Sequence, residues 1–201
     1  MRRPETLAAL LLLLVTLSAC GSPMNTPDIK HNPHPKMRYE ITIMIQDAPG
    51  AFESVNGSVQ YRVKNDDCVP LQPVSGARLV PEEDVHVTFH RVSEHEYKGT
   101  IYLDLLQDED YYGLGVCHWG LVNVAAELKA GKMIFTPYIG VDQIIAQRPS
   151  VQYFLKSNYS GDASKEGAAL PRIPGTPAAE YVEQHPDKRF LITIAAKESF
   201  E

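Results

Sequence analysis

The sequence predicts a mainly β protein, an antiparallel β-sandwich with an Ig-like or transthyretin-like outline and a short helical and loop insertion near the C-terminus. Two observations support this fold class. At least seven short segments alternate apolar and polar residues with a period of two, the pattern of a strand with one buried face. Gly, Pro, Asn and Asp residues, which favour turns, separate these segments.

The first strands follow from this alternation. Residues 37–46 place an apolar side chain at every second position, and the turn sequence at 47–50 ends the strand. Residues 59–64 alternate in the same way and stop at the turn residues 65–67. Residues 85–90 form the next predicted strand.

The second half of the sheet region is predicted from shorter signals. Residues 93–96 form a tight hairpin connection into a strand at 97–103. Residues 114–128 are apolar on both faces, which is typical of a central strand. Residues 131–135 form a short strand, and 190–194 form the last clear one.

The stretch between the last two strands has a different character. Residues 141–146 are predicted to form one or two helical turns. Residues 160–176 are rich in Gly, Ala, Pro and Ser, which predicts a mobile loop. Thr176-Pro177 has the pattern of a helix N-cap followed by proline, so a short helix is expected through Gln184 until Pro186 stops it.

The N-terminus carries a targeting signal. An arginine pair precedes a short apolar core at 8–17, and the quartet Leu17-Ser18-Ala19-Cys20 closes the segment. This quartet resembles the lipobox of bacterial lipoproteins, in which the cysteine thiol is acylated and becomes the new N-terminus. The resemblance implies a signal peptide at 1–19 and a lipid on Cys20. Because Gly21 follows, and not Asp, it also implies an anchor in the outer membrane, facing the periplasm.

Three other interpretations of this segment compete with the lipobox. A transmembrane anchor would need about 20 apolar residues, and the apolar core is shorter. An ordinary secretory signal cut after Ala19 leaves Cys20 incidental. Twin-arginine export fits the arginine pair alone, because no further residue of that motif follows.

Residues 20–36 are predicted to be the lipidated cysteine and a proline-rich tether. They hold four prolines and no apolar periodicity. An extended proline-rich chain rises about 3.1 Å per residue, so the tether would lift the domain up to roughly 50 Å from the membrane. Residues 37–201 then form a single domain.

The overall charge limits the partners. The chain has a formal net charge of −6, which argues against nucleic acid, because such partners require a basic surface. It also argues against electrostatic binding to anionic lipid. The expected partners are the membrane, reached through the N-terminal lipid, and a protein in the periplasm.

Two cysteines remain once Cys20 carries lipid. In an oxidising compartment we expect Cys68 and Cys117 to form a disulfide that ties the end of the second strand to the central strand. Buried free thiols and a metal site are the alternatives, although the CxxC spacing of zinc sites is absent. Trp119 is expected to pack against the bridge.

The histidines give little support for catalysis. His86 and His90 lie four apart on a strand, about 13 Å, which is too far to share an ion. His95 begins an HExxH pattern whose second histidine is replaced by Gly99. His118 is more typical of a hydrogen-bonded core histidine than of a catalytic one. No GxSxG or SxxK signature occurs, and we expect no catalytic residue, metal or cofactor.

One acidic and aromatic stretch is a candidate interaction surface. Within it, Asp108, Asp110 and Gly113 match the first, third and sixth positions of an EF-hand calcium loop. Trp119 stands at the twelfth position, where an EF-hand has its bidentate Glu, so a solvated turn is the plainer interpretation. Tyrosine is common in binding sites because it offers a large contact area at low entropic cost. The candidates are Asp104, Asp108, Glu109, Asp110, Tyr111 and Tyr112.

The function expected from sequence is a non-catalytic, outer-membrane-anchored lipoprotein whose β-sandwich binds a protein or an envelope component. One alternative is an immunity-type inhibitor of a toxic enzyme that enters the periplasm, with the acidic stretch plugging a cationic cleft. A second is an envelope hydrolase that uses His118 and nearby acids. A third is a structural lipoprotein that serves envelope integrity.

Overall fold

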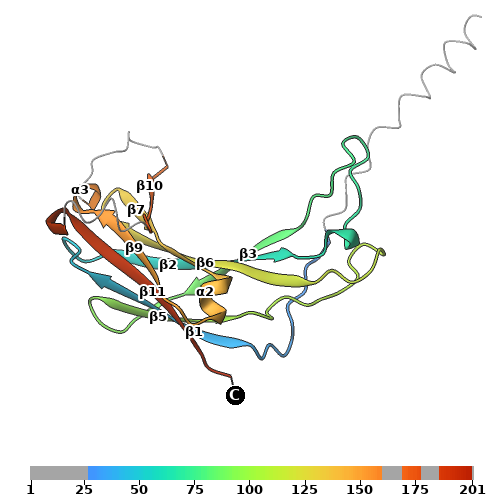
Figure 1. Ribbon diagram of the computed structural model, residues 1–201, viewed down its shortest axis with the longest axis horizontal. Helices are drawn as coiled ribbons and strands as arrows, with labels where there is room; N and C mark the ends of the chain where they lie inside the picture. Colours follow the sequence, from blue (N-terminus) through green and yellow to red (C-terminus); the bar gives the residue numbers. More distant parts are fainter. Residues whose placement is uncertain (1–26, 160–168, 178–185, 201) are drawn as a thin grey trace, which may run out of the picture.

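The structure is a computed structural model that describes residues 27–159, 169–177 and 186–200. Its strands form two sheets that pack against each other around one main core (Figure 1). The predicted β-sandwich with a short helical insertion is confirmed. No helix within the three described ranges is long and apolar enough to cross a membrane.

The first sheet is antiparallel and runs in the order β4, β5, β1, β11, β9. These strands span His90–Arg91, Glu96–Tyr102, Arg38–Gln46, Arg189–Glu198 and Ser150–Leu155, respectively. The second sheet runs in the order β10, β7, β6, β2, β3, and β8 also pairs with β6. Its strands span Arg172–Pro174, Met133–Thr136, Trp119–Ala130, Ser54–Val63 and Glu82–Thr88, with β8 at Tyr138–Gly140.

The helical elements are short and lie between strands. The predicted helical segment at 141–146 is confirmed as α2 (Val141–Ile145). A second short helix, α3 (Lys156–Tyr159), follows β9 directly. The 3-10 turns are η2 (Asp66–Cys68) and η3 (Pro186–Lys188).

The main core lies between the two sheets. In β1 the alternate residues Ile41, Ile43 and Ile45 are buried, as the period of two predicts. Phe135 of β7 is fully buried and packs edge-on against a neighbouring ring, with 5.2 Å between its centroid and that of Phe190. Removing such side chains from water stabilises the fold by roughly 25 cal/mol per Å² of apolar surface.

The strand predicted at 85–90 is two strands, because the chain changes sheet at Phe89. β3 belongs to the second sheet and β4 to the first. Phe89 is buried against Gly57 of β2 and Gly99 of β5, and a Cβ on Gly99 would lie 2.9 Å from its ring. Glycine at both positions lets the ring sit directly on the backbone of each sheet.

The central strand begins later than the sequence predicts. β6 starts at Trp119, and residues 114–118 are irregular because Gly113 and Gly115 have positive φ angles of 72° and 112°. One face of β6 is only half-buried, with Val122 38% exposed, so the expectation of burial on both faces is wrong.

The stretch predicted as helix and loop contains strands. β9 was not predicted, because its inward positions begin with Ser150 and Gln152, which break the apolar alternation. The Gln152 side-chain NH2 group donates to the Tyr138 carbonyl at 2.9 Å, whereas its Oε1 is buried without a hydrogen-bond partner among the described residues. β10 lies inside the range 160–176 expected to be a loop. The signal peptide, Cys20, residues 160–168 and most of the helix expected after Thr176 lie outside the described residues.

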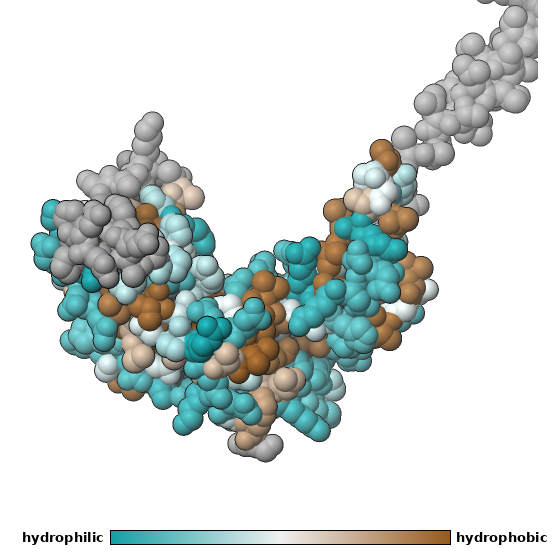
Figure 2. Space-filling model, in the orientation of Figure 1, coloured by the Kyte–Doolittle hydropathy of each residue, from teal (hydrophilic) through white to brown (hydrophobic). Residues whose placement is uncertain are grey.

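An arm projects from the sandwich at the end away from α3 (Figure 1). We define the arm as residues 64–81 and 107–118. The predicted disulfide is confirmed: Cys68 and Cys117 join the two segments with Cα atoms 5.3 Å apart. The arm has its own small core around the bridge, and Trp119 packs against it as predicted. Figure 2 shows a hollow between the arm and the body of the sandwich, with apolar residues at its centre.

Candidate functional site

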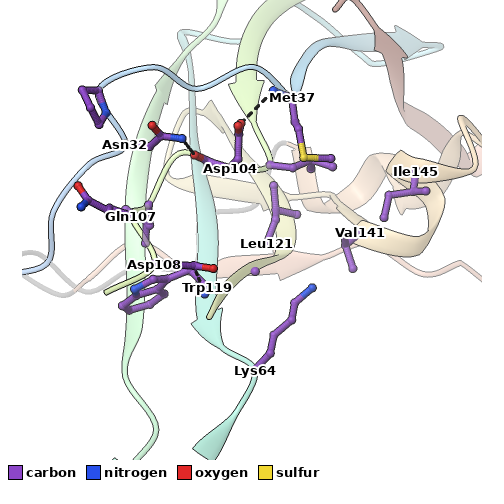
Figure 3. Close-up of a pocket in the computed structure, with 14 residues that line it drawn as sticks. Asn32, Met37, Lys64, Asp104, Gln107, Asp108, Trp119, Leu121, Val141 and Ile145 are labelled. Carbon is purple, nitrogen blue, oxygen red and sulfur yellow. Dashed lines mark hydrogen bonds between the residues drawn. The ribbon is translucent and has the colours of Figure 1, made fainter. Parts of the chain in front are cut away.

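A groove of about 660 Å³ opens at the base of the arm (Figure 3). It lies where the N-terminal segment, the connection from β5 to β6, the end of β2 and α2 meet. Most of its lining residues are apolar. The apolar lining residues are Pro33, Met37, Leu103, Leu106, Trp119, Leu121, Val141 and Ile145, and the others are Asn32, Lys64, Asp104, Gln107, Asp108 and Gly120.

One wall of the groove is the N-terminal segment 30–37, which we call the strap. It follows the chain after β5, with a β-bridge between His31 and Leu106. The backbone N–H of Asn32 donates to the Leu105 carbonyl at 2.7 Å, and that of Gln107 donates to the Lys30 carbonyl at 2.9 Å. The expectation of an unfixed tether through residue 36 is therefore wrong for the strap. Backbone hydrogen bonds hold the strap in place. Because such bonds do not depend on side-chain type, the sequence shows no apolar periodicity that would reveal them.

Asp104 fixes the point where the strap enters β1. Its carboxylate accepts the backbone N–H groups of Lys36 and Met37, each at 2.9 Å. Its backbone carbonyl accepts the side-chain amide of Asn32 at 2.9 Å (Figure 3). Both carboxylate oxygens are thus used within the chain, so Asp104 orders the groove wall and does not act as a free acid.

Glu109 and Tyr111 hold the start of the strap. The Lys30 ammonium lies 2.6 Å from the Glu109 carboxylate, and this hydrogen bond raises the pKa of Lys30 above its ordinary value. The Tyr111 hydroxyl accepts the Lys30 backbone N–H at 3.3 Å and donates to the Gln107 carbonyl at 2.7 Å. Glu109 and Tyr111, two more residues of the predicted interaction surface, therefore form hydrogen bonds within the chain.

Asp108 and Asp110 bond the backbone on either side of the bridge. Asp108 accepts the Trp119 N–H at 2.9 Å, and its other oxygen lies 2.7 Å from Nδ1 of His118. Asp110 accepts the N–H groups of Leu114 and Gly115 at 3.0 and 3.2 Å. The acidic stretch is thus a set of local backbone acceptors.

The remaining candidates are Tyr112 and His118. Tyr112 packs against the small core of the arm, where burial raises the pKa of its hydroxyl. The His118 side chain is 60% exposed, so the expectation of a core histidine is wrong, although its expected hydrogen bond is present. Among the described residues, no three His, Cys, Asp or Glu side chains gather closely enough to hold a metal ion.

Lys64 is the charged group that the groove leaves available. Its side chain lies across Gly120, where a Cβ would come within 2.7 Å of the lysine Cδ. Within the described part of the chain, its ammonium has no hydrogen bond or ion pair. Sequence reasoning missed Lys64, Met37 and Ile145, because they come from elements far apart in the chain and no local pattern marks them.

No protein-family model matches the chain, and neither a curated protein nor a solved structure is significantly similar to it.

Proposed function

We propose that this chain is an outer-membrane lipoprotein whose periplasmic β-sandwich binds a protein partner in the groove, without catalysing a reaction. One observation carries the binding proposal: two apolar side chains of the groove, Met37 and Ile145, are left 42% and 58% exposed. Clustered apolar side chains in a concave wall with a polar rim are typical of a binding site.

The charges of the groove indicate the chemistry of the partner. Asp104 is engaged by two backbone N–H groups and Asp108 by the Trp119 N–H and the His118 ring, whereas the Lys64 ammonium stands at the wall with no partner among the described residues. A partner that inserts one or two apolar side chains and places a carboxylate beside Lys64 fits this arrangement. A volume of about 660 Å³ is in the range of sites that hold a few side chains.

This reasoning also weighs against the acidic-loop version of the immunity-type inhibitor. That version needs free carboxylates to enter a cationic cleft. Asp104, Asp108 and Asp110 each accept hydrogen bonds from the chain's own backbone, and Glu109 is paired with Lys30. Binding a cationic cleft would have to compete with these local interactions.

A hydrolase is the second candidate, and one observation favours it. Asp108 and His118 are paired through Nδ1 of the imidazole, as the acid and base of a catalytic triad are. The imidazole is exposed, and its Nε2 atom is not used in the contact with Asp108. A nucleophile is the missing part: among the described residues the His118 side chain is hydrogen-bonded to Asp108 alone. Binding is therefore the better-supported proposal.

The variant Ile145→Asp tests the groove. Placing a carboxylate against an apolar partner segment is expected to reduce co-purification of the partner at least about tenfold, since tenfold corresponds to about 1.4 kcal/mol. The measurement is quantitative mass spectrometry of proteins retained with tagged, membrane-extracted protein.

Val92→Asp is the matched control. Val92 is 57% exposed, like Ile145, but it lies beyond β4, next to the end of β1 opposite to Met37. Surface substitutions of this kind change the free energy of unfolding by less than about 0.5 kcal/mol. Equal recovery of the same proteins with both variants would refute binding in the groove. The variant His118→Ala is expected to retain the same amount of partner protein as the wild type. If the protein were a hydrolase that binds its substrate through His118, this variant would no longer retain the bound protein.

A further inference from the structure

The arm ends in exposed aliphatic side chains, which we call the tip. They come from the hairpin of the first arm segment, and they are exposed by 57% to 101% of their surface. Large apolar residues gathered in this way mark a contact surface, whereas single ones do not. The tip consists of Leu71, Val74 and Leu79. Leu114 and Val116 are also exposed, on the second arm segment.

The tip is held in place by the structure of the arm. Residues 71–78 form a hairpin with a bridge between Leu71 and Arg78, and Val74 at its turn is fully exposed. The Arg78 guanidinium turns back to donate to the carbonyls of Asp66 and Asp67 at 3.0 and 2.9 Å. The second segment is fixed by the disulfide and by the Asn65 amide, which donates to the Val116 carbonyl at 2.8 Å. The tip is therefore a preformed surface.

The tip is also free of charge. Residues 68–77 contain no Asp, Glu, Lys or Arg, although charged residues make up 22% of the chain, and the guanidinium of Arg78, next to Leu79, turns away to the carbonyls of Asp66 and Asp67. Protein interfaces draw their binding energy mainly from Trp, Tyr and Arg, and Leu and Val are under-represented among such residues. An uncharged aliphatic tip is better matched to the apolar edge of a lipid headgroup layer.

The path of the chain brings the tip close to the expected anchor. Lys30 contacts Glu109 and Tyr111, which are both in the arm. A lipid on Cys20 is ten residues from Lys30, and a fully extended chain of that length spans at most about 35 Å. The anchor therefore tethers the chain at the arm, and the opposite end of the sandwich lies farther from it.

From these observations we infer that the arm tip docks into the membrane that holds the lipid anchor, as a second contact with the lipid surface. The inference rests on the lipid anchor of the proposed function. With a net charge of −6, the chain gains little from anionic lipid, so the contact depends on apolar insertion and is expected to be insensitive to salt. Two contacts would hold the domain in a fixed orientation, with the groove at the base of the arm.

The test places a tryptophan in the tip of the lipidated full-length protein. The variant Val74→Trp is reconstituted in vesicles of phosphatidylethanolamine and phosphatidylglycerol with brominated acyl chains, and the emission of Trp119 in the wild type is subtracted. We expect a blue shift and quenching by about half, because interfacial side chains enter roughly 5–10 Å into the boundary of headgroups and acyl chains. Val92→Trp, at an exposed valine far from the arm, is expected to show neither. Leu71→Trp repeats the measurement from a second position of the hairpin.

The outcomes separate the inference from the anchor. Flotation of the protein with the vesicles, together with equal and weak quenching at positions 74 and 92, would leave the anchor standing and overturn the docking of the tip. If the protein does not float with the vesicles and carries no acyl mass on Cys20, both the lipid anchor and the docking of the tip are overturned. A blue shift at position 74 that rises with protein concentration in the absence of lipid would assign the tip to a second copy of the chain and overturn the inference.

Discussion

Replacing Cys68 and Cys117 together by alanine is expected to lower the free energy of unfolding by about 4 kcal/mol. The bridge joins residues with a sequence separation of 49. In the chain-entropy model, a cross-link over this length lowers the conformational entropy of the unfolded chain enough to raise the free energy of unfolding by about 4 kcal/mol. The loop contains β3, β4 and β5, so its closure constrains strands of both sheets.

Urea unfolding followed by circular dichroism measures this effect. The wild type in a reducing agent serves as the control and is expected to reach the same midpoint as the double variant. Hydrogen exchange should also show the largest loss of protection in the arm, because its small core is built around the bridge. A midpoint unchanged from that of the oxidised wild type would contradict this account of the arm.

Phe135→Ala is expected to lower the free energy of unfolding by about 3–5 kcal/mol, the usual range for a buried phenylalanine. The Phe135 ring is fully buried between the sheets. Its centroid lies 5.2–5.8 Å from three other rings, all at steep angles. Aromatic pairs of this kind contribute beyond their buried area. The three rings are those of Phe52, Phe154 and Phe190.

Tyr138→Ala is the matched control for this core position. Tyr138 lies three residues beyond Phe135 in sequence and is 46% exposed. Its loss is expected to change the unfolding midpoint little, since exposed side chains rarely contribute more than about 0.5 kcal/mol. Similar midpoints for the two variants would show that the aromatic cluster is not the centre of the core.

Much of the sandwich is predictable from sequence because its strands have one buried and one exposed face. β1 alternates apolar and polar residues along most of its length, β11 has a buried apolar residue at every second position from Phe190 to Ala196, and both appear at the predicted places. The disulfide is predictable from the cysteine count and from the oxidising compartment that the lipobox resemblance implies. β9 fails the same reasoning because Gln152 occupies a buried position, where its side-chain NH2 group donates to the Tyr138 carbonyl of another strand.

The candidate site is less predictable because its parts meet only in the folded chain. The acidic stretch was identified as chemically unusual, but the roles of its residues depend on the backbone N–H groups that face them. The Asp104 carboxylate accepts hydrogen bonds from the strap, which lies more than 60 residues away in the sequence. Lys64 and Ile145 belong to a turn after β2 and to α2, and neither segment has a pattern that indicates a shared groove.

Site-specific photo-cross-linking in living cells tests binding in the groove most directly. A benzophenone amino acid replaces Met37, which lines the groove, or Met44, which is equally exposed on the outer side of β1. The two methionines are 42% and 40% exposed, so their access to solvent is matched. We expect one discrete cross-linked protein from position 37, lost when Ile145→Asp is added, and none from position 44. Equal products from both positions, or a product from position 37 that survives Ile145→Asp, would contradict the assignment of the groove as the binding site.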